Sequence, residues 1–293
     1  MKLIDGKLLA KTIKEEIAVE VTAITSKGKR PPHLAAVLVG EDPASQSYVR
    51  NKVRSCEQVG FESSMIRKDA ETTEAELLEI IDRLNADDAI DGFIVQLPLP
   101  KHINEERITL AIDPKKDVDG FHPVNFGRMA QGLSCYLPAT PFGILQMLDR
   151  YKIEVEGKEC VVIGRSNIVG SPISILLSRK ASPGNATITL CHSRTKDIAF
   201  HTRRADILIV ALGRPEFITG DMVKEGVVVI DVGINRVDDE TAKRGYRLRG
   251  DVNFEEVAAK ASYITPVPGG VGPMTVTSLL MNTLKAYRKE VFG

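Results

Sequence analysis

The segment CVVIGRSNIVGSP, from Cys160 to Pro172, constrains the fold of this chain more than any other stretch. An apolar run of β-branched residues ends at Gly164, a short polar loop follows, and Pro172 opens a new apolar-periodic segment. This order is typical of a strand, a tight glycine turn and a helix start, where free backbone N–H groups and the helix dipole favour phosphate. The spacing is not GxGxxG, because Ser166 replaces the second glycine and the next one is Gly170. The turn indicates a dinucleotide site, although an ordinary strand–helix turn stays open.

Short apolar runs alternate with amphipathic segments along the whole chain. Strands are expected at residues 34–39, 63–66, 92–97, 161–163, 187–191, 206–211, 227–232 and 263–267. The main helices are expected at 9–24, 45–59, 73–84, 104–112, 141–148, 172–179 and 274–287, and Thr73 with Glu76 resembles a capping box. Because short, uniformly apolar strands need cover on both faces, the pattern predicts an α/β fold with parallel sheets. The 293 residues suffice for two domains, and the Gly- and Pro-rich stretch 121–139 is expected to be an irregular linker.

Charge and cysteine usage exclude several classes of function. Basic and acidic residues balance at 39 each without a long run of either sign, which argues against a nucleic-acid or membrane-surface partner. No apolar run is as long as a membrane span, and the N-terminus lacks the apolar core and cleavage site of a signal peptide. The four cysteines form no CxxC pair and the five histidines no HExxH motif. We therefore expect reduced thiols, a cytoplasmic protein and no bound metal.

The residues that follow the strand at 187–191 favour NADP over NAD. In a dinucleotide fold this strand ends beside the adenosine ribose, where a carboxylate would accept a hydrogen bond from the 2′-hydroxyl of NAD. Here the strand is followed by Ser193 and Arg194, with no carboxylate between residues 192 and 195. A hydroxyl and a guanidinium suit a 2′-phosphate, and Arg165 in the glycine turn is placed to join them. A solvated basic loop is the alternative.

Two other loops of the second half have the composition of a binding site. After the strand at 227–232, Gly233 would permit close backbone approach and Ile234 would pack on a ring. Between Tyr263 and Thr275, three prolines and three glycines precede a helix. Such a backbone is stiff and can approach a ligand closely, which favours a functional loop over a simple linker.

Polar side chains of the first half are candidates for chemistry. Tyr48 and Lys52 share a face of a predicted helix, and a lysine can transfer protons if burial lowers its pKa, although such a pair is more often a surface contact. Gln96 interrupts an apolar strand, where a buried amide needs partners and serves either a site or the structure. Asp117 and Asp119 lie in a glycine loop, where a carboxylate binds a ring edge with two N–H donors or forms an ordinary Asx turn.

Six segments together resemble one family, the bifunctional methylenetetrahydrofolate dehydrogenase/methenyltetrahydrofolate cyclohydrolase of the FolD type. They span almost the whole chain in the expected order: YVRNK at 48–52, VQLPLP at 95–100, KDVDGF at 116–121, GRSNIVG at 164–170, DVGIN at 231–235 and PVPGGVGPMT at 266–275. Each piece alone is unspecific, but the joint match is highly specific. The chain departs from the pattern at Ala139, where the family typically has cysteine, and that side chain is not the reacting one.

The resemblance implies two α/β domains with parallel sheets around a cleft. Residues 1–139 would form a folate-binding and catalytic domain, residues 140–273 a Rossmann-type NADP-binding domain, and the helix 274–293 would pack back on the first. The family is usually a homodimer through its Rossmann domains. The residues implied to hold NADP are Gly164, Arg165, Ser166, Ser193 and Ile234.

The resemblance also implies two reactions. NADP-dependent oxidation of 5,10-methylenetetrahydrofolate to 5,10-methenyltetrahydrofolate is followed by hydrolysis to 10-formyltetrahydrofolate. The catalytic residues would be Lys52, Tyr48, Gln96 and Asp119: the lysine, tuned by the glutamine, moves protons, the aspartate binds the aminopyrimidine edge of the pterin, and the tyrosine walls its ring. The further substrate contacts implied are Val95, Leu97, Pro268, Gly269, Gly270, Val271 and Gly272.

Two other functions stay open from the residues alone. A different NADP-dependent oxidoreductase with the same two-domain plan, such as an amino-acid dehydrogenase, would explain the glycine turn but not YVRNK and PGGVGPMT together. A non-catalytic nucleotide sensor would have no need of Lys52, Gln96 and Asp119. Formation of NADPH from methylenetetrahydrofolate and NADP separates the three.

Overall fold

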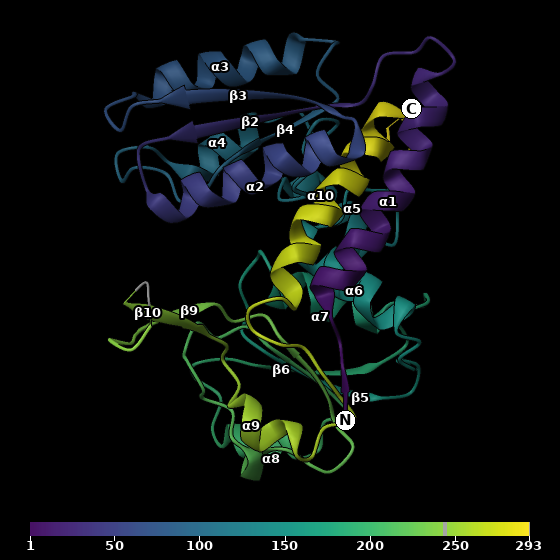
Figure 1. Cartoon of the computed structure of the whole chain (residues 1–293), viewed down its shortest axis with the longest axis vertical. Coiled ribbons are helices and arrows are strands. Elements are labelled where there is room, and N and C mark those ends of the chain that lie inside the picture. The colour runs from purple at the N-terminus through teal and green to yellow at the C-terminus, as the bar shows by residue number, and fades with distance from the viewer. Residues whose placement is uncertain (243–244, 293) are drawn as a thin grey trace. The chain divides into compact units, whose positions relative to one another are not determined.

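The computed structural model describes residues 1–242 and 245–292, apart from the side chains of residues 43, 44 and 47. The chain forms two compact units, one of residues 1–10 and 140–275 and the other of residues 11–139 and 276–293. We call them the six-stranded unit and the three-stranded unit after their sheets (Figure 1). Residues 1–10 group with the second half of the chain because β1 (Lys2–Leu3) pairs with β11 (Tyr263–Ile264).

Parallel pairing joins the strands of the three-stranded unit in the order β3-β2-β4. Its strands are β2 (His33–Val39), β3 (Glu62–Lys68) and β4 (Gly92–Val95). Its helices are most of α1 (Gly6–Thr25), α2 (Pro43–Val59), α3 (Glu74–Ala86), α4 (Glu105–Ala111), α5 (Pro123–Ala130) and most of α10 (Val271–Tyr287). Figure 1 shows α2 and α3 on opposite faces of this sheet. The central strand β2 is therefore buried along nearly its whole length, which its continuous apolar sequence predicts.

Side-chain caps fix the ends of the helices in this unit. The Asp42 carboxylate accepts from the backbone N–H of Ser45 at 2.7 Å where α2 begins, and α2 ends at Gly60, whose φ of 77° is left-handed. Thr73 and Glu76 form the predicted capping box at the start of α3. The position of α2 matters because this helix carries Lys52.

Residues 121–139 are not wholly irregular, so the predicted linker is wrong in part. The helix α5 occupies residues 123–130, since His122 Nδ1 accepts from the N–H of Val124 at 3.1 Å and Pro123 lies in the first turn, where no N–H is needed. An antiparallel hairpin of β9 (Asn235–Asp238) and β10 (Tyr246–Arg249) also escaped prediction. Its strands are mostly exposed and therefore lack the apolar pattern of the buried ones.

The six strands of the other sheet run parallel in the order β1-β11-β8-β7-β5-β6. The strands not yet described are β5 (Glu159–Ile163), β6 (Thr187–Cys191), β7 (Ile207–Val210) and β8 (Val228–Asp231). The helices are α6 (Ala139–Arg150), α7 (Gly170–Ser178), α8 (Ile198–Thr202) and α9 (Phe254–Ala258), with a 3₁₀ turn at Gly220–Met222. The predicted α/β fold with parallel sheets is confirmed.

The strand order of this sheet reverses beside β5, which has β6 on one side and β7 on the other. Ligands of open α/β sheets bind beyond the carboxyl ends of the strands at such a reversal. The glycine turn follows β5 and therefore lies at the expected place. None of the helices in the described ranges is long and apolar enough to cross a membrane.

Candidate functional site

Lys52 is a buried lysine at the centre of the candidate catalytic group in the three-stranded unit. Its side chain belongs to α2, and the residue is only 4% exposed. Burial lowers the pKa of the amine, and the charges of Asp119 and Cys56 act in the opposite direction. The amine lies 4.8 Å from the centre of the Tyr48 ring. A lysine in such a position gives up its proton more readily than an exposed lysine and can exchange it with a bound molecule.

Gln96 holds the amine of Lys52 in place. It follows the end of β4, and its own N–H bonds to the carbonyl of Val37 at 2.9 Å. Its side-chain Nε2 donates to the carbonyl of Leu97 at 2.6 Å, so Oε1 is left to accept from Lys52 Nζ at 3.3 Å. The amide is therefore oriented by the backbone and presents an acceptor, not a donor, to the lysine.

The two carboxylates of the glycine loop have different environments. Asp117 is buried and accepts hydrogen bonds from the backbone N–H of Phe121 (3.2 Å) and His122 (2.8 Å) and from Asn125 Nδ2 (2.9 Å). Burial raises its pKa to about 7. The Asp119 carboxylate is partly exposed and makes no hydrogen bond within the described ranges. Asp117 is thus the turn-forming residue, and Asp119 is the one available to a ligand.

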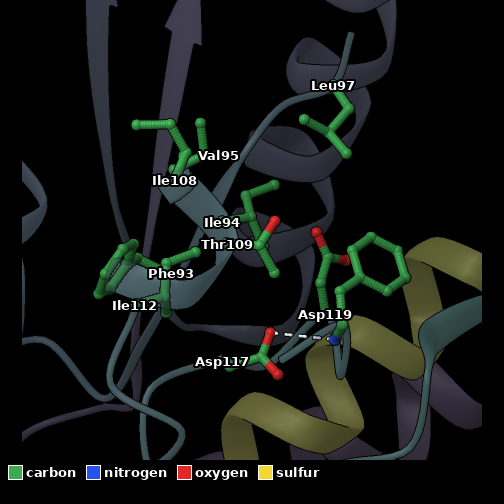
Figure 2. Close-up of a pocket in the computed structure, with 10 residues that line it drawn as sticks. Phe93, Ile94, Val95, Leu97, Ile108, Thr109, Ile112, Asp117 and Asp119 are labelled. Carbon is green, nitrogen blue, oxygen red and sulfur yellow. Dashed lines mark hydrogen bonds between the residues drawn. The ribbon is translucent and has the colours of Figure 1, made fainter. Parts of the chain in front are cut away.

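Both carboxylates line a hollow of the three-stranded unit (Figure 2). Apolar side chains make most of the wall: Val95 belongs to β4, Leu97 follows this strand, and Phe121 comes from the glycine loop. An apolar wall with a few polar groups is typical of the places where proteins bind small molecules. The structure brings Lys52, Tyr48 and Gln96 together, and the Asp119 charge acts on Lys52.

Glycines shape the turn after β5 in the six-stranded unit. Gly164 has a φ of 110°, and a Cβ on it would lie 2.2 Å from the carbonyl oxygen of Ala211, which follows β7. A Cβ on Gly170 would lie 1.8 Å from the oxygen of Gly164. Ser166 stabilises the turn, because its hydroxyl accepts from the N–H of Val169 at 3.1 Å. Only glycine fits the two tightest positions, and the turn leads directly into α7.

Two exposed polar side chains at this edge have the chemistry to bind a phosphate. Arg165 lies in the turn and Ser193 follows β6, and in the described part of the chain neither side chain has a hydrogen bond or ion pair. Together with the glycine turn they fit a nucleotide with a 2′-phosphate. Across residues 1–242 and 245–292, no group of His, Cys, Asp and Glu side chains is arranged to hold a metal ion.

The first turn of α10 lies beside Ile234. A Cβ on Gly272 would be 3.5 Å from Ile234 Cδ1, and the Ile234 side chain is 58% exposed despite being apolar. Gly269 has a φ of 107°, and its carbonyl accepts from the N–H of Lys7 at 2.9 Å. Pro268–Gly272 thus belong to the six-stranded unit, whereas Lys52, Gln96 and Asp119 belong to the three-stranded unit.

The structure explains the glycine at position 233 differently from the sequence-based prediction of a close approach to a ligand. A Cβ there would meet the carboxyl carbon of Asp251 at 2.3 Å, so the missing side chain makes room for Asp251 rather than for a ligand. Sequence reasoning missed Asp251, and it also gave no role to Asp231, Asn125 or Cys56. For Asp231, one signal of such a role was present in the sequence: this aspartate lies in the otherwise apolar stretch expected to form the strand at 227–232.

Comparison with known proteins shows the family to which the chain belongs. The profile of the tetrahydrofolate dehydrogenase/cyclohydrolase catalytic domain matches residues 4–119, and that of the NAD(P)-binding domain of the same family matches residues 138–291. The chain is 61% identical to the bifunctional protein FolD of Cytophaga hutchinsonii over 98% of this chain and 99% of the relative. It is 59% identical to the same protein of Phocaeicola vulgatus over the full length of both.

Solved structures agree with the relatives. The bifunctional FolD enzyme of Campylobacter jejuni superposes with a TM-score of 0.93 at 48% identity, covering 99% of both chains. The dehydrogenase–cyclohydrolase of Trypanosoma brucei, solved with NADP and an inhibitor, gives a TM-score of 0.93 at 38% identity, covering 99% of this chain and 98% of that one. The chain therefore belongs to the tetrahydrofolate dehydrogenase/cyclohydrolase family, as a bifunctional, NADP-binding enzyme of the FolD type.

Proposed function

We propose that the three-stranded unit binds the folate and moves the protons of a two-step reaction, while the six-stranded unit binds NADP. The first step oxidises 5,10-methylenetetrahydrofolate to 5,10-methenyltetrahydrofolate, and the second hydrolyses that product to 10-formyltetrahydrofolate. The pairing of buried Lys52 with the oriented Gln96 amide carries the proposal, because the lysine has a lowered pKa and the glutamine a fixed acceptor. The functional domains that we propose are residues 1–139 with the helix 274–293 for the folate and residues 140–273 for NADP, although residues 1–10 group with the six-stranded unit.

The oxidation needs orientation more than acid–base help. Bound NADP supplies a hydride acceptor. The two folate nitrogens beside the one-carbon bridge donate electron density to it, so the hydride leaves without a general base, and a methenyl cation remains. The protein's part is to hold the two molecules: the Asp119 carboxylate takes the N–H edge of the pterin, and Tyr48 walls its ring. Val95 and Leu97 line the hollow that holds Asp119. The remaining substrate contacts that we propose are Pro268, Gly269, Gly270, Val271 and Gly272.

The hydrolysis needs proton transfer, which we assign to Lys52. Its neutral amine takes a proton from the water that adds to the methenyl carbon, and the resulting ammonium returns this proton to the ring nitrogen as the carbon–nitrogen bond breaks. The hydroxyl of the adduct loses its own proton to solvent as the formyl carbonyl forms. Burial favours the neutral amine that starts this cycle. Gln96 Oε1 accepts from the amine in either protonation state and so keeps Nζ in one place.

The six-stranded unit supplies the cofactor contacts. Gly164 and Ser166 form the turn that receives the phosphates, and Arg165 with Ser193 contacts the 2′-phosphate. Ile234 packs against the nicotinamide end, which its exposure at the carboxyl edge of the sheet supports. The lack of a carboxylate after β6 supports NADP over NAD.

A variant of Lys52 tests the assignment. The native protein should form NADPH from methylenetetrahydrofolate and NADP, and Lys52→Met should lower cyclohydrolase turnover by about 10²–10⁴-fold while folate binding is largely kept. Lys14→Met is the matched control, since Lys14 is also partly buried with a lowered pKa but bonds to Ser55 and Gln58. Full hydrolysis by Lys52→Met would remove this lysine from the mechanism.

We further propose that the protein acts in the cytoplasm as a homodimer through its six-stranded units. The four cysteines are free and buried, which suits a reducing compartment. The edge strand β6 leaves Leu190 37% exposed, and the adjoining α8 leaves Phe200 54% exposed, which supports an interface there. Sedimentation velocity should give a dimer for the native protein and a monomer for a Leu190→Lys, Phe200→Glu variant; a native monomer would contradict the proposal.

A further inference from the structure

A buried carboxylate organises the carboxyl edge of the six-stranded sheet. Asp251 has no exposed surface and accepts four hydrogen bonds. Its Oδ2 accepts from the backbone N–H of Leu212 (2.6 Å) and Gly213 (2.9 Å), and its Oδ1 accepts from the N–H of Arg214 (2.9 Å) and from Asn235 Nδ2 (2.8 Å). One side chain thus ties together the loop after β7 and the loop after β8.

A second buried aspartate holds Asp251 in place. Asp231 ends β8, and its carboxylate accepts from the backbone N–H of Gly233 (2.9 Å), Asp251 (3.0 Å) and Val252 (3.0 Å). Within the described ranges neither aspartate has an ion pair with a lysine or arginine, so uncharged donors provide the hydrogen bonds. The two carboxylates therefore form a chain from β8 through Asp251 to the loop after β7.

Two glycines make room for the pair. A Cβ on Gly233 would meet the Asp251 carboxyl carbon at 2.3 Å, and a Cβ on Gly250 would meet Asp231 Oδ2 at 1.8 Å. The sequence DVGIN at 231–235 and the dipeptide Gly250-Asp251 are thus parts of one structure. Loops held by so many bonds to buried groups have little freedom to move.

The loops held by Asp251 adjoin the expected cofactor site. The residue before Leu212 is Ala211, whose carbonyl packs against Gly164 of the glycine turn. The loop after β8 carries the exposed Ile234, next to Asn235. In a parallel sheet the loops after strands on either side of the reversal form the walls of the nucleotide site. Asp251 has no exposed surface itself, so its effect on a bound molecule passes through these loops.

We propose that Asp251 is a positioning residue for the dehydrogenase step, fixing the loops after β7 and β8 against the nicotinamide end of NADP. The proposal rests on the proposed function, because it takes NADP to lie at this edge. It predicts that damage to Asp251 separates the two activities, since hydrolysis of methenyltetrahydrofolate consumes no NADP.

The test is Asp251→Asn, which keeps the shape and replaces an acceptor by an amide N–H facing backbone donors. The KM for NADP should rise, or the NADP-dependent kcat fall, by about tenfold to a hundredfold, as expected for a misplaced reactant. Cyclohydrolase turnover of methenyltetrahydrofolate and the KM for folate should stay within about twofold of the native values. A loss shared equally by both activities would overturn the proposal.

The matched control is Asp206→Asn at the other end of β7. Asp206 accepts from the N–H of Glu159 at 2.9 Å and pairs with Lys224 at 2.6 Å, so its variant disturbs the same strand without reaching the two loops. NADP kinetics that are equal in the two variants would overturn the proposal. If Asp251→Asn does not fold, Asn235→Ala, which removes one donor to Asp251, must raise the NADP KM without lowering hydrolysis.

Other results would contradict the proposed function itself and not only the positioning role of Asp251. If the native protein formed no NADPH from methylenetetrahydrofolate, or if Arg165→Ala left NADP kinetics unchanged, the cofactor site itself would be wrong. A native enzyme that responds to Arg165→Ala but not to Asp251→Asn would refute only the positioning role.

Discussion

Each unit holds a buried aspartate that fixes a loop through hydrogen bonds, but the two units use their loops differently. Asp117 in the three-stranded unit and Asp231 in the six-stranded unit each accept three hydrogen bonds, and burial raises the pKa of each to about 7. Two residues after Asp117 comes Asp119, whose charge acts on the ionisable amine of Lys52 on the capped helix α2. Beside Asp231 lie backbone N–H groups, glycines and the apolar Ile234.

The difference separates chemistry from positioning. In the proposed mechanism, proton transfer in the three-stranded unit depends on one side chain, which a helix and one amide hold in place, so a single substitution should remove it. Cofactor binding in the six-stranded unit depends on backbone geometry held by several buried bonds, so single substitutions should weaken it by degrees. Variants of the two units should therefore affect the two activities unequally.

The largest effect after Lys52 itself is expected for Gln96→Leu. The leucine leaves Lys52 Nζ without its acceptor and frees the carbonyl of Leu97. Cyclohydrolase kcat should fall about a hundredfold, and the NADP KM should not change. Gln58→Leu is the control, since Gln58 lies on α2 like Lys52 and accepts from another lysine, Lys14 of α1, at 3.2 Å. Similar losses in both variants would contradict a specific role for Gln96.

A smaller effect is expected for Arg165→Ala in the other unit. Removing the guanidinium should raise the KM for NADP about tenfold, because a charge-assisted bond to phosphate is lost. The KM for NAD should change little, since NAD lacks the 2′-phosphate. Steady-state kinetics with both cofactors measure this, and equal effects on the two would mean that Arg165 does not contact that phosphate.

The sequence predicted a region well where its contacts join residues that are close together along the chain. Strand and helix positions were predictable because burial leaves a periodic pattern, and the Thr73–Glu76 cap is local. Lys52 and Gln96 were candidates from their motifs, but their 3.3 Å contact joins a helix to a strand end 44 residues away. The bond between Asp231 and Asp251 also depends on folding, which brings together residues 20 positions apart. The exposed hairpin β9–β10 carries no apolar pattern to read.

Asp119→Asn is expected to shift the pH dependence of cyclohydrolase turnover while Lys52 and Gln96 stay in place. The negative charge of Asp119 raises the pKa of Lys52, so its removal should lower that pKa further. The neutral amine would then persist to lower pH, and the acidic limb of the cyclohydrolase kcat profile should move to lower pH. The profile of kcat isolates this from weaker folate binding, because it reports the bound complex. A limb that moved to higher pH would contradict the electrostatic coupling.

The smallest effect is expected on the pH dependence of stability, measured in variants of Asp117 and Asp231. In the folded protein each carboxyl keeps its proton up to about pH 7, whereas in the unfolded chain it ionises near 3.8. The folded state therefore binds more protons between these values, and stability falls as pH rises from about 4 to 7, by at most about 1.4 kcal/mol per pH unit for each group. Asp117→Asn and Asp231→Asn, neutral at every pH, should each flatten the fall seen in urea unfolding at pH 4.5, 5.5 and 6.5. A slope unchanged in one variant would mean that its aspartate is ionised in the folded protein, and that the two loops are held by groups of different charge.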